Sequence, residues 1–158
     1  MKKKLLVLAL FLTLFSVFTA SAYTAAIGGE FSMPLLGGLP NSALLSFRLP
    51  KFPAVFGLGL YIPTNGGSAA FALLADWWLV QGPLVGFINY YVGPGLFFGA
   101  FANDFSLGLR VPIGLSAFPI KPLELFIEFA PAVAFLAPNG ISIPNFNLQA
   151  GFGFRFWF

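Results

Sequence analysis

The carboxyl-terminal segment alternates strictly between apolar residues and small or polar ones. One parity holds Phe146, Leu148, Ala150, Phe152, Phe154, Phe156 and Phe158, and the other holds Asn147, Gln149, Gly151, Gly153, Arg155 and Trp157. Successive side chains of a β-strand point to opposite faces, so this period of two predicts a strand with one apolar face. Residues 104–118 repeat the pattern. A helix would instead place Arg110 and Arg155 among aromatic neighbours.

The composition indicates that lipid surrounds much of the chain. Of the 158 residues, 58% are hydrophobic and 8% are charged, against roughly 45–50% and 25% in ordinary soluble domains. Only helices and closed β-barrels satisfy every backbone polar group within lipid. Residues 52–75 and 77–103 are uncharged runs long enough for spanning helices, but Pro and Gly interrupt both. We therefore expect an all-β protein, with a helical inner-membrane protein as the alternative.

The alternating template, extended backward, predicts eight strands. They cover residues 23–33, 42–49, 53–62, 68–79, 87–101, 104–118, 121–136 and 145–158. An even number suits a closed antiparallel up-and-down transmembrane barrel with both termini at one end. The connections would be 33–41, 63–67, 102–103 and 137–144 on the outer side, and 50–52, 80–86 and 118–120 on the periplasmic side.

The first 22 residues have the pattern of a secretory signal peptide. Lys2, Lys3 and Lys4 precede an apolar stretch over residues 5–18, and Ala20-Ser21-Ala22 forms a small-residue cleavage pattern. The apolar stretch is shorter than the ~20 residues of a membrane anchor, which is the alternative. Cleavage after Ala22 would leave residues 23–158 as one barrel domain. The eight basic and five acidic residues of the chain would then become five of each, which gives no basic patch for nucleic acid.

Every charge of the predicted barrel can avoid lipid, where an Arg or Lys costs about 2–4 kcal/mol at mid-depth. Lys51, Asp104 and Lys121 fall in or beside turns. The other seven charged residues point inward in this register and form a candidate lumenal network: Glu30, Arg48, Asp76, Arg110, Glu124, Glu128 and Arg155. Counting heights along the strands places Arg155 near Glu124 and Arg110 near Glu128. The network is either structural, fixing register and filling the interior, or part of a polar constriction or binding site.

The rest of the predicted lumen combines many glycines with a few large rings. An eight-stranded barrel is about as narrow as side chains can fill, so we expect a largely filled lumen. A small apolar pocket, lined by Tyr61, Tyr91, Phe97 and Phe126, is the alternative. Three prolines fall inside consecutive strands, where each removes a ladder hydrogen bond: Pro94, Pro112 and Pro131. They indicate either β-bulges or a lateral gap between strands.

The closing sequence GFGFRFWF, residues 151–158, and its terminal aromatic residue resemble small bacterial outer-membrane β-barrel proteins. The segments YYVGPG at 90–95, LGLRVPIGL at 107–115 and ELFIEFAP at 124–131 are similar to uncharacterised single-domain barrels of Gram-negative and spirochaete-type bacteria. This resemblance implies an outer-membrane location and contacts with outer-membrane lipids. It also implies an assembly signal for the outer-membrane assembly machinery, formed by Phe154, Phe156, Trp157 and Phe158.

The chain offers little for catalysis. It has no Cys and no His, and it contains no phosphate-binding loop, dinucleotide fingerprint, metal-ligand spacing or nucleophile elbow. It resembles eight-stranded enzymes acting on lipid A in size and in its strand prolines, but their chemistry uses a His. We expect a non-enzymatic, porin-like barrel without cofactor or metal, structural or of unknown specific role. The alternatives are a small-pocket binding or transport barrel for an apolar or lipid-like ligand, and then a lipid-modifying enzyme.

Overall fold

The computed structural model describes residues 24–49, 51–62, 69–102, 104–137 and 140–158. The predicted signal peptide, residues 1–22, and the predicted connection 63–67 lie outside the described residues. No helix within these described ranges is long and apolar enough to cross a membrane.

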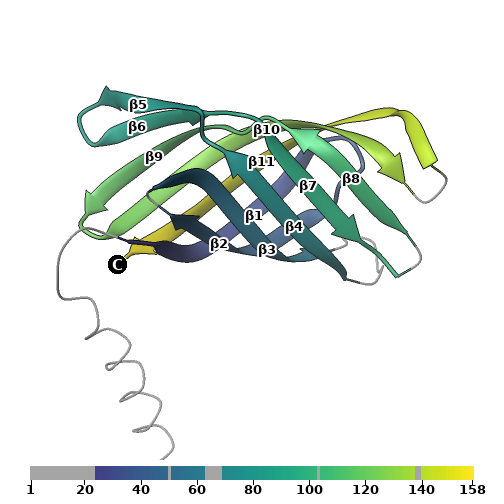
Figure 1. The fold of residues 1–158 in the computed structure, drawn as a ribbon, viewed down its shortest axis with the longest axis horizontal. Coiled ribbons are helices and arrows are strands. Elements are labelled where there is room, and N and C mark those ends of the chain that lie inside the picture. The colour runs from purple at the N-terminus through teal and green to yellow at the C-terminus, as the bar shows by residue number, and fades with distance from the viewer. Residues whose placement is uncertain (1–23, 50, 63–68, 103, 138–139) are drawn as a thin grey trace, which may run out of the picture.

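Eleven strand segments form one antiparallel sheet across the described residues (Figure 1). They are β1 (Ala26–Leu36), β2 (Asn41–Leu49), β3 (Phe52–Ile62), β4 (Ala70–Trp77), β5 (Val80–Val85), β6 (Ile88–Val92), β7 (Gly95–Ala100), β8 (Phe105–Arg110), β9 (Ile113–Ile120), β10 (Leu123–Ala137) and β11 (Gly140–Trp157).

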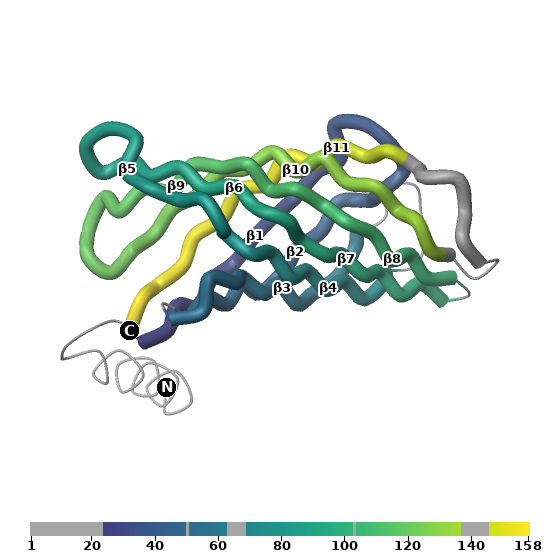
Figure 2. Tube along the Cα trace, turned by 45° about the horizontal axis from the view of Figure 1, so that its top comes forward, coloured from purple at the N-terminus to yellow at the C-terminus, as the bar shows by residue number. Residues whose placement is uncertain are grey.

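The segments combine into eight wall strands. β4 and β5, β6 and β7, and β8 and β9 are successive parts of three single strands, and β10 pairs with both β8 and β9. The sheet closes because β11 pairs with β10 on one side and with β1 on the other. The described chain is thus a closed eight-stranded antiparallel up-and-down barrel, and the predicted fold class is confirmed. Figure 2 follows the chain around it.

The pairing of β1 with β11, which closes the barrel, runs along the length of β1 and continues beyond both strands at the chain termini. Ala26 lies opposite Trp157, and the ladder continues to Leu36 opposite Leu148. Beyond the ladder, Thr24 N donates to Phe158 O at 2.7 Å and Phe158 N donates to Ala25 O at 2.9 Å. The two chain termini of the barrel therefore lie side by side at one end, called here the terminus end.

The three strand prolines lie in a row across neighbouring strands. Trp77 N donates to Pro94 O at 2.8 Å, Gly93 N to Pro112 O at 3.3 Å, and Val111 N to Pro131 O at 2.9 Å. The row divides β6 from β7 and β8 from β9, but these backbone bonds join each strand to the next. They contradict a lateral gap at the prolines and favour local irregularities of the sheet.

One predicted connection is itself a strand. Residues 80–86 are predicted as a periplasmic connection, but β5 pairs with β6 and forms a hairpin that extends the wall at the terminus end (Figure 1). Val80, Leu84 and Val85 are all exposed, so no inside-outside alternation marks this strand. At the opposite end, β1 runs to Leu36 and β11 begins at Gly140, which shortens the predicted connections 33–41 and 137–144.

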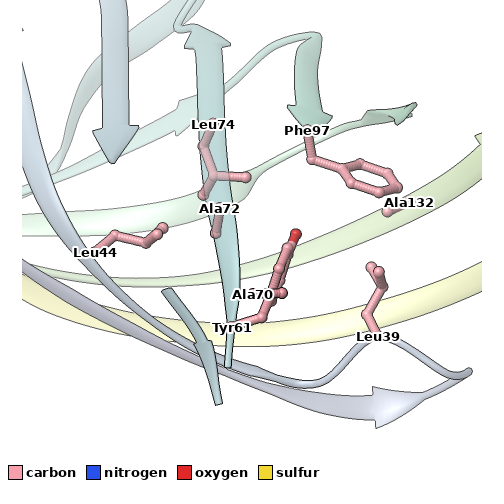
Figure 3. Close-up of a cluster of buried hydrophobic side chains, with 8 residues drawn as sticks. All are labelled: Leu39, Leu44, Tyr61, Ala70, Ala72, Leu74, Phe97 and Ala132. Atoms are coloured by element: carbon pink, nitrogen blue, oxygen red, sulfur yellow. The ribbon is translucent and has the colours of Figure 1, made fainter. Parts of the chain in front are cut away.

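The two faces of the barrel wall differ in chemistry as the alternation predicts. Large apolar side chains such as Leu45, Phe129 and Phe152 are half exposed on the outside. Inside, one apolar cluster occupies the half away from the termini: Leu39, Leu44, Tyr61, Ala70, Ala72, Leu74, Phe97 and Ala132 (Figure 3). A second cluster lies nearer the terminus end and contains Val55, Trp78, Tyr91 and Phe126.

Candidate lumenal site

Glu124 is the centre of a charged group near the terminus end, which we call the end cluster (Arg48, Glu124 and Arg155). Its Oε1 accepts from Arg48 Nη1 at 3.1 Å and lies 3.6 Å from Arg155 Nη1. Its Oε2 accepts from Trp157 Nε1 at 2.8 Å. The strand register brings these groups together, because Glu124 of β10 lies directly opposite Arg155 of β11. Both carboxylate oxygens thus have partners, as a buried charge requires.

Aromatic rings surround the two guanidiniums of the end cluster. The Arg48 guanidinium carbon lies 4.0 Å from the centroid of the Trp78 ring, and that of Arg155 lies 3.8 Å from the centroid of Phe126. Trp78 in turn stacks on Tyr91 at 3.6 Å between centroids. Arg155 Nε donates to Ser46 Oγ at 2.9 Å. Cation–π contacts of this kind stabilise a cation that has left water.

A second group, the middle cluster (Asp76, Arg110 and Glu128), lies deeper in the barrel. Arg110 Nη2 donates to Glu128 Oε1, and Arg110 Nε lies 3.3 Å from Asp76 Oδ1. Tyr91 Oη donates to Glu128 Oε2 at 2.8 Å. All three charged side chains of this cluster are buried. Along β10, Glu128 is separated from Glu124 by Phe126, so an apolar layer lies between the two clusters.

The seventh residue of the predicted network, Glu30, has no ion pair within 4 Å among the described residues, but it lies within electrostatic range of Arg110 and Glu128 of the middle cluster. Glu30 is buried on β1, and its Oε1 accepts a long hydrogen bond from Ser32 Oγ at 3.5 Å. Across the described residues, the interior therefore holds four carboxyl groups and three guanidiniums. Several buried donors there have no hydrogen-bond partner, among them Arg110 Nη1, Arg155 Nη1, Gln149 Nε2 and Trp78 Nε1.

The four rings predicted to line an apolar pocket are divided between the two apolar clusters. Tyr61 and Phe97 belong to the first, and Tyr91 and Phe126 belong to the second. All four are at least 98% buried. Phe97 packs against Gly108, where a Cβ would overlap the ring, so the missing side chain makes room for it. The rings do not form one shared lining.

The residues of the predicted assembly signal lie on both faces of β11. Phe154 and Phe158 are exposed on the outer face, with Phe156 against Phe154 at 5.8 Å between centroids. Trp157 points inward, and its hydrogen bond to Glu124 connects the terminal strand to the end cluster.

Sequence reasoning missed several polar partners of the charged groups. Gln81 Oε1 accepts from Arg48 Nη2 at 2.7 Å and ties β5 to β2. Ser46 and Tyr91 bind Arg155 and Glu128, as given above. The inward parity of Ser46 and Tyr91 was available in the sequence, but the identity of their partners depends on the register of the strand between them. Gly28 lies opposite both Ser46 and Arg155, and Gly114 lies opposite both Tyr91 and Glu128. Within the described residues, no group of three acidic, His or Cys side chains could hold a metal ion.

The fold and its interior define a class, the closed eight-stranded β-barrel with an ionic interior and an apolar exterior. No protein-family model and no curated protein matches the chain. Among solved structures, the chain is similar to the crystal structure of Neisserial surface protein A (NspA), with a TM-score of 0.52. The match covers 85% of this chain and 94% of that one at 15% sequence identity. At that identity the likeness concerns the fold.

Proposed function

We propose that the protein is an integral outer-membrane β-barrel of a Gram-negative bacterium, non-enzymatic and structural or porin-like in type, with a largely filled lumen. The observation that carries this proposal is the outer surface. Large apolar side chains cover it, including Leu45, Ile127, Phe129 and Phe152, each at least 50% exposed. Soluble proteins rarely expose extended apolar surface, whereas an apolar outer wall of this kind is suited to lipid.

The positions of the charges support a membrane-spanning wall. Of the ten charged residues after the predicted signal peptide, seven point into the barrel. The other three, Lys51, Asp104 and Lys121, lie in or beside the turns at its ends. The wall thus presents no charge to lipid between its two ends.

The apolar face is also tall enough to cross a bilayer. It runs from Phe146 on β11 to Phe158, the residue that follows this strand. At about 3.3 Å per residue and a strand tilt near 40°, this stretch rises about 30 Å along the barrel axis, which is comparable with the ~25 Å apolar band of outer-membrane barrels.

Export and assembly complete the proposal. Residues 1–22 would direct the chain out of the cytoplasm and be removed after Ala22, and Phe154, Phe156, Trp157 and Phe158 would be recognised by the assembly machinery. The exposed positions of Phe154 and Phe158 at the terminus end suit recognition by another protein or by lipid. Outer-membrane lipids are the partners that the exterior requires.

The interior supports a structural role for the charged network. Ion pairs link β2 to β10, β10 to β11, and β8 to both β4 and β10, so they connect adjacent strands and strands separated by one or two others. The apolar rings form two separate clusters rather than one pocket, which favours the filled lumen over a central ligand cavity.

Expression of the full coding sequence in a Gram-negative host, followed by membrane fractionation and intact mass measurement, tests the proposal. We expect the protein in the outer-membrane fraction, with a mass that corresponds to a chain beginning at Tyr23. Recovery from the inner membrane or the soluble fraction would overturn the location. A mass that includes residues 1–22 would overturn the cleavage.

A further inference from the structure

The geometry points to a binding site for a small amphiphilic anion in the mouth of the barrel at the terminus end. The anionic group, a carboxylate or a phosphate ester, would lie at Arg48 and Trp78, and the apolar body would lie beneath the β5–β6 hairpin. This inference goes beyond the structural role proposed above.

A cavity of about 330 Å³ lies at this mouth, between the hairpin and the end cluster. Its lining includes Arg48, Trp78, Gln81, Asn89, Phe118 and Trp157. Known small-molecule sites are mostly apolar cavities with a few polar groups, and they begin at about 300 Å³. The cavity is distinct from the predicted central pocket, because none of the four rings assigned to that pocket lines it.

Donors rather than acceptors are left without partners at this mouth. Trp78 is 2% exposed, and its Nε1 has no hydrogen-bond partner among the described residues. Arg155 Nη1, behind it in the end cluster, is likewise without a hydrogen bond. Arg48 uses one N–H group on Glu124 and one on Gln81, although its guanidinium carries five. Unpaired buried donors cost free energy that an acceptor group would recover.

The charge at this end of the barrel also favours an anion. Two guanidiniums share the single carboxylate of Glu124, so the end cluster has a net positive charge. The turns at the same end add Lys51 and Lys121, and the only other charged turn residue in the described chain, Asp104, lies at the opposite end. A mouth with an excess of positive charge raises the local concentration of anions.

The apolar side of the cavity selects an amphiphile over a simple inorganic anion. Phe118 and Trp157 contribute rings, with centroids 6.4 Å apart, and Pro83 and Tyr90 of the hairpin add to the lining. A chain or ring attached to the anionic group could contact these side chains. Two sources offer such chemistry: a free organic acid, and the headgroup of an anionic phospholipid in the surrounding leaflet.

Tryptophan fluorescence can test the site directly. The chain has three tryptophans, and Trp78 and Trp157 line the cavity, so the Trp77→Phe variant reports on the site. We would extract this variant from membranes in maltoside detergent and titrate it with octanoate and, as a neutral match, octanol. We expect saturable fluorescence changes with octanoate only. Equal changes with octanol, or no change with any anion tested, would overturn the proposal.

A second arm distinguishes the two sources. The same variant, transferred to phosphatidylcholine nanodiscs with or without phosphatidylglycerol, would show a shift on adding phosphatidylglycerol if the headgroup of a lipid is bound. An octanoate response in detergent without this shift indicates a free organic acid. A shift without an octanoate response indicates the lipid source.

Substitutions separate binding from a purely structural role of Arg48. We expect Arg48→Gln to weaken binding at least tenfold and the exposed turn control Lys51→Gln to change it less than twofold.

Gln81→Leu removes a partner of Arg48 and keeps the charge, so binding should be equal or tighter. If Arg48 had only a structural role, losing its Gln81 partner would disturb the site and weaken binding. Loss of binding in Gln81→Leu would therefore contradict the proposal even if Arg48→Gln failed to fold. Wild-type affinity in a folded Arg48→Gln variant would also contradict it.

Discussion

At the scale of single residues, Glu124 is a buried carboxylate on which two guanidiniums depend for their counter-charge. It is fully buried and is the only carboxylate that pairs with Arg48 and Arg155 among the described ion pairs. Glu124→Gln would leave the buried guanidinium of Arg155 and the partly exposed one of Arg48 without a counter-charge, and breaking a buried pair in this way costs about 3–5 kcal/mol. We expect a loss of that size in the free energy of unfolding, measured by urea titration in detergent. The exposed Lys51→Gln control should unfold like the wild type, and an equally stable Glu124→Gln variant would show that the end cluster does not stabilise the barrel.

Gly99 lies where a larger side chain would overlap its neighbours. A Cβ there would lie 2.7 Å from Tyr61 Cε2 and 3.1 Å from Phe101 Cε2. Both neighbours are side chains, so overpacking of about 1–3 kcal/mol is expected for Gly99→Ala. Tyr61→Leu in the same chain should remove part of this cost, which a double-mutant cycle on urea unfolding would measure. Gly38→Ala, which meets open space, should be neutral, and an uncoupled Gly99–Tyr61 pair would contradict this packing.

At the scale of elements, the strict alternation of residues 104–118 across β8 and β9 and of residues 146–158 along β11 was enough to predict which side chains face inward. β5 could not be predicted, because its side chains are exposed on both faces and Gly82-Pro83 imitates a turn. The division of the strands at Gly93-Pro94 and Val111-Pro112 was indicated by the prolines themselves. The backbone hydrogen bonds that join neighbouring strands at these prolines depend on strand register, which the residue types alone do not determine.

The depth of a residue on the outer face should decide the cost of a charge there. Phe152 lies within β11 and is 50% exposed, whereas Ile120 lies beside the β9–β10 turn and is 62% exposed. In lipid vesicles, Phe152→Arg should cost about 2–4 kcal/mol and Ile120→Arg about 0–1 kcal/mol. Urea unfolding from vesicles measures both values. Similar small costs at the two positions would indicate that water, rather than lipid, surrounds the wall.

At the scale of the whole molecule, the two faces of the wall differ: large apolar side chains are exposed outside, and charged and polar side chains are buried inside. The sequence indicated this division through seven inward charges and three turn charges. It also indicated the proximity of Arg155 to Glu124 and of Arg110 to Glu128, because these pairs lie on adjacent strands at similar heights. Asp76 and Arg110 both lie opposite Gly95 of β7, so they meet over the strand between them. This row and the contact of Arg48 with Gln81 depend on the registers of neighbouring strands, which counting along single strands did not give.

We expect the outer wall of this barrel to require an apolar solvent. Far-UV circular dichroism of the urea-denatured protein, diluted either into phosphatidylcholine vesicles or into buffer alone, tests this requirement. We expect a strand-dominated spectrum with vesicles, and aggregation or an unfolded spectrum in buffer. A helical spectrum in vesicles, or a soluble strand-dominated monomer in buffer without lipid, would contradict it.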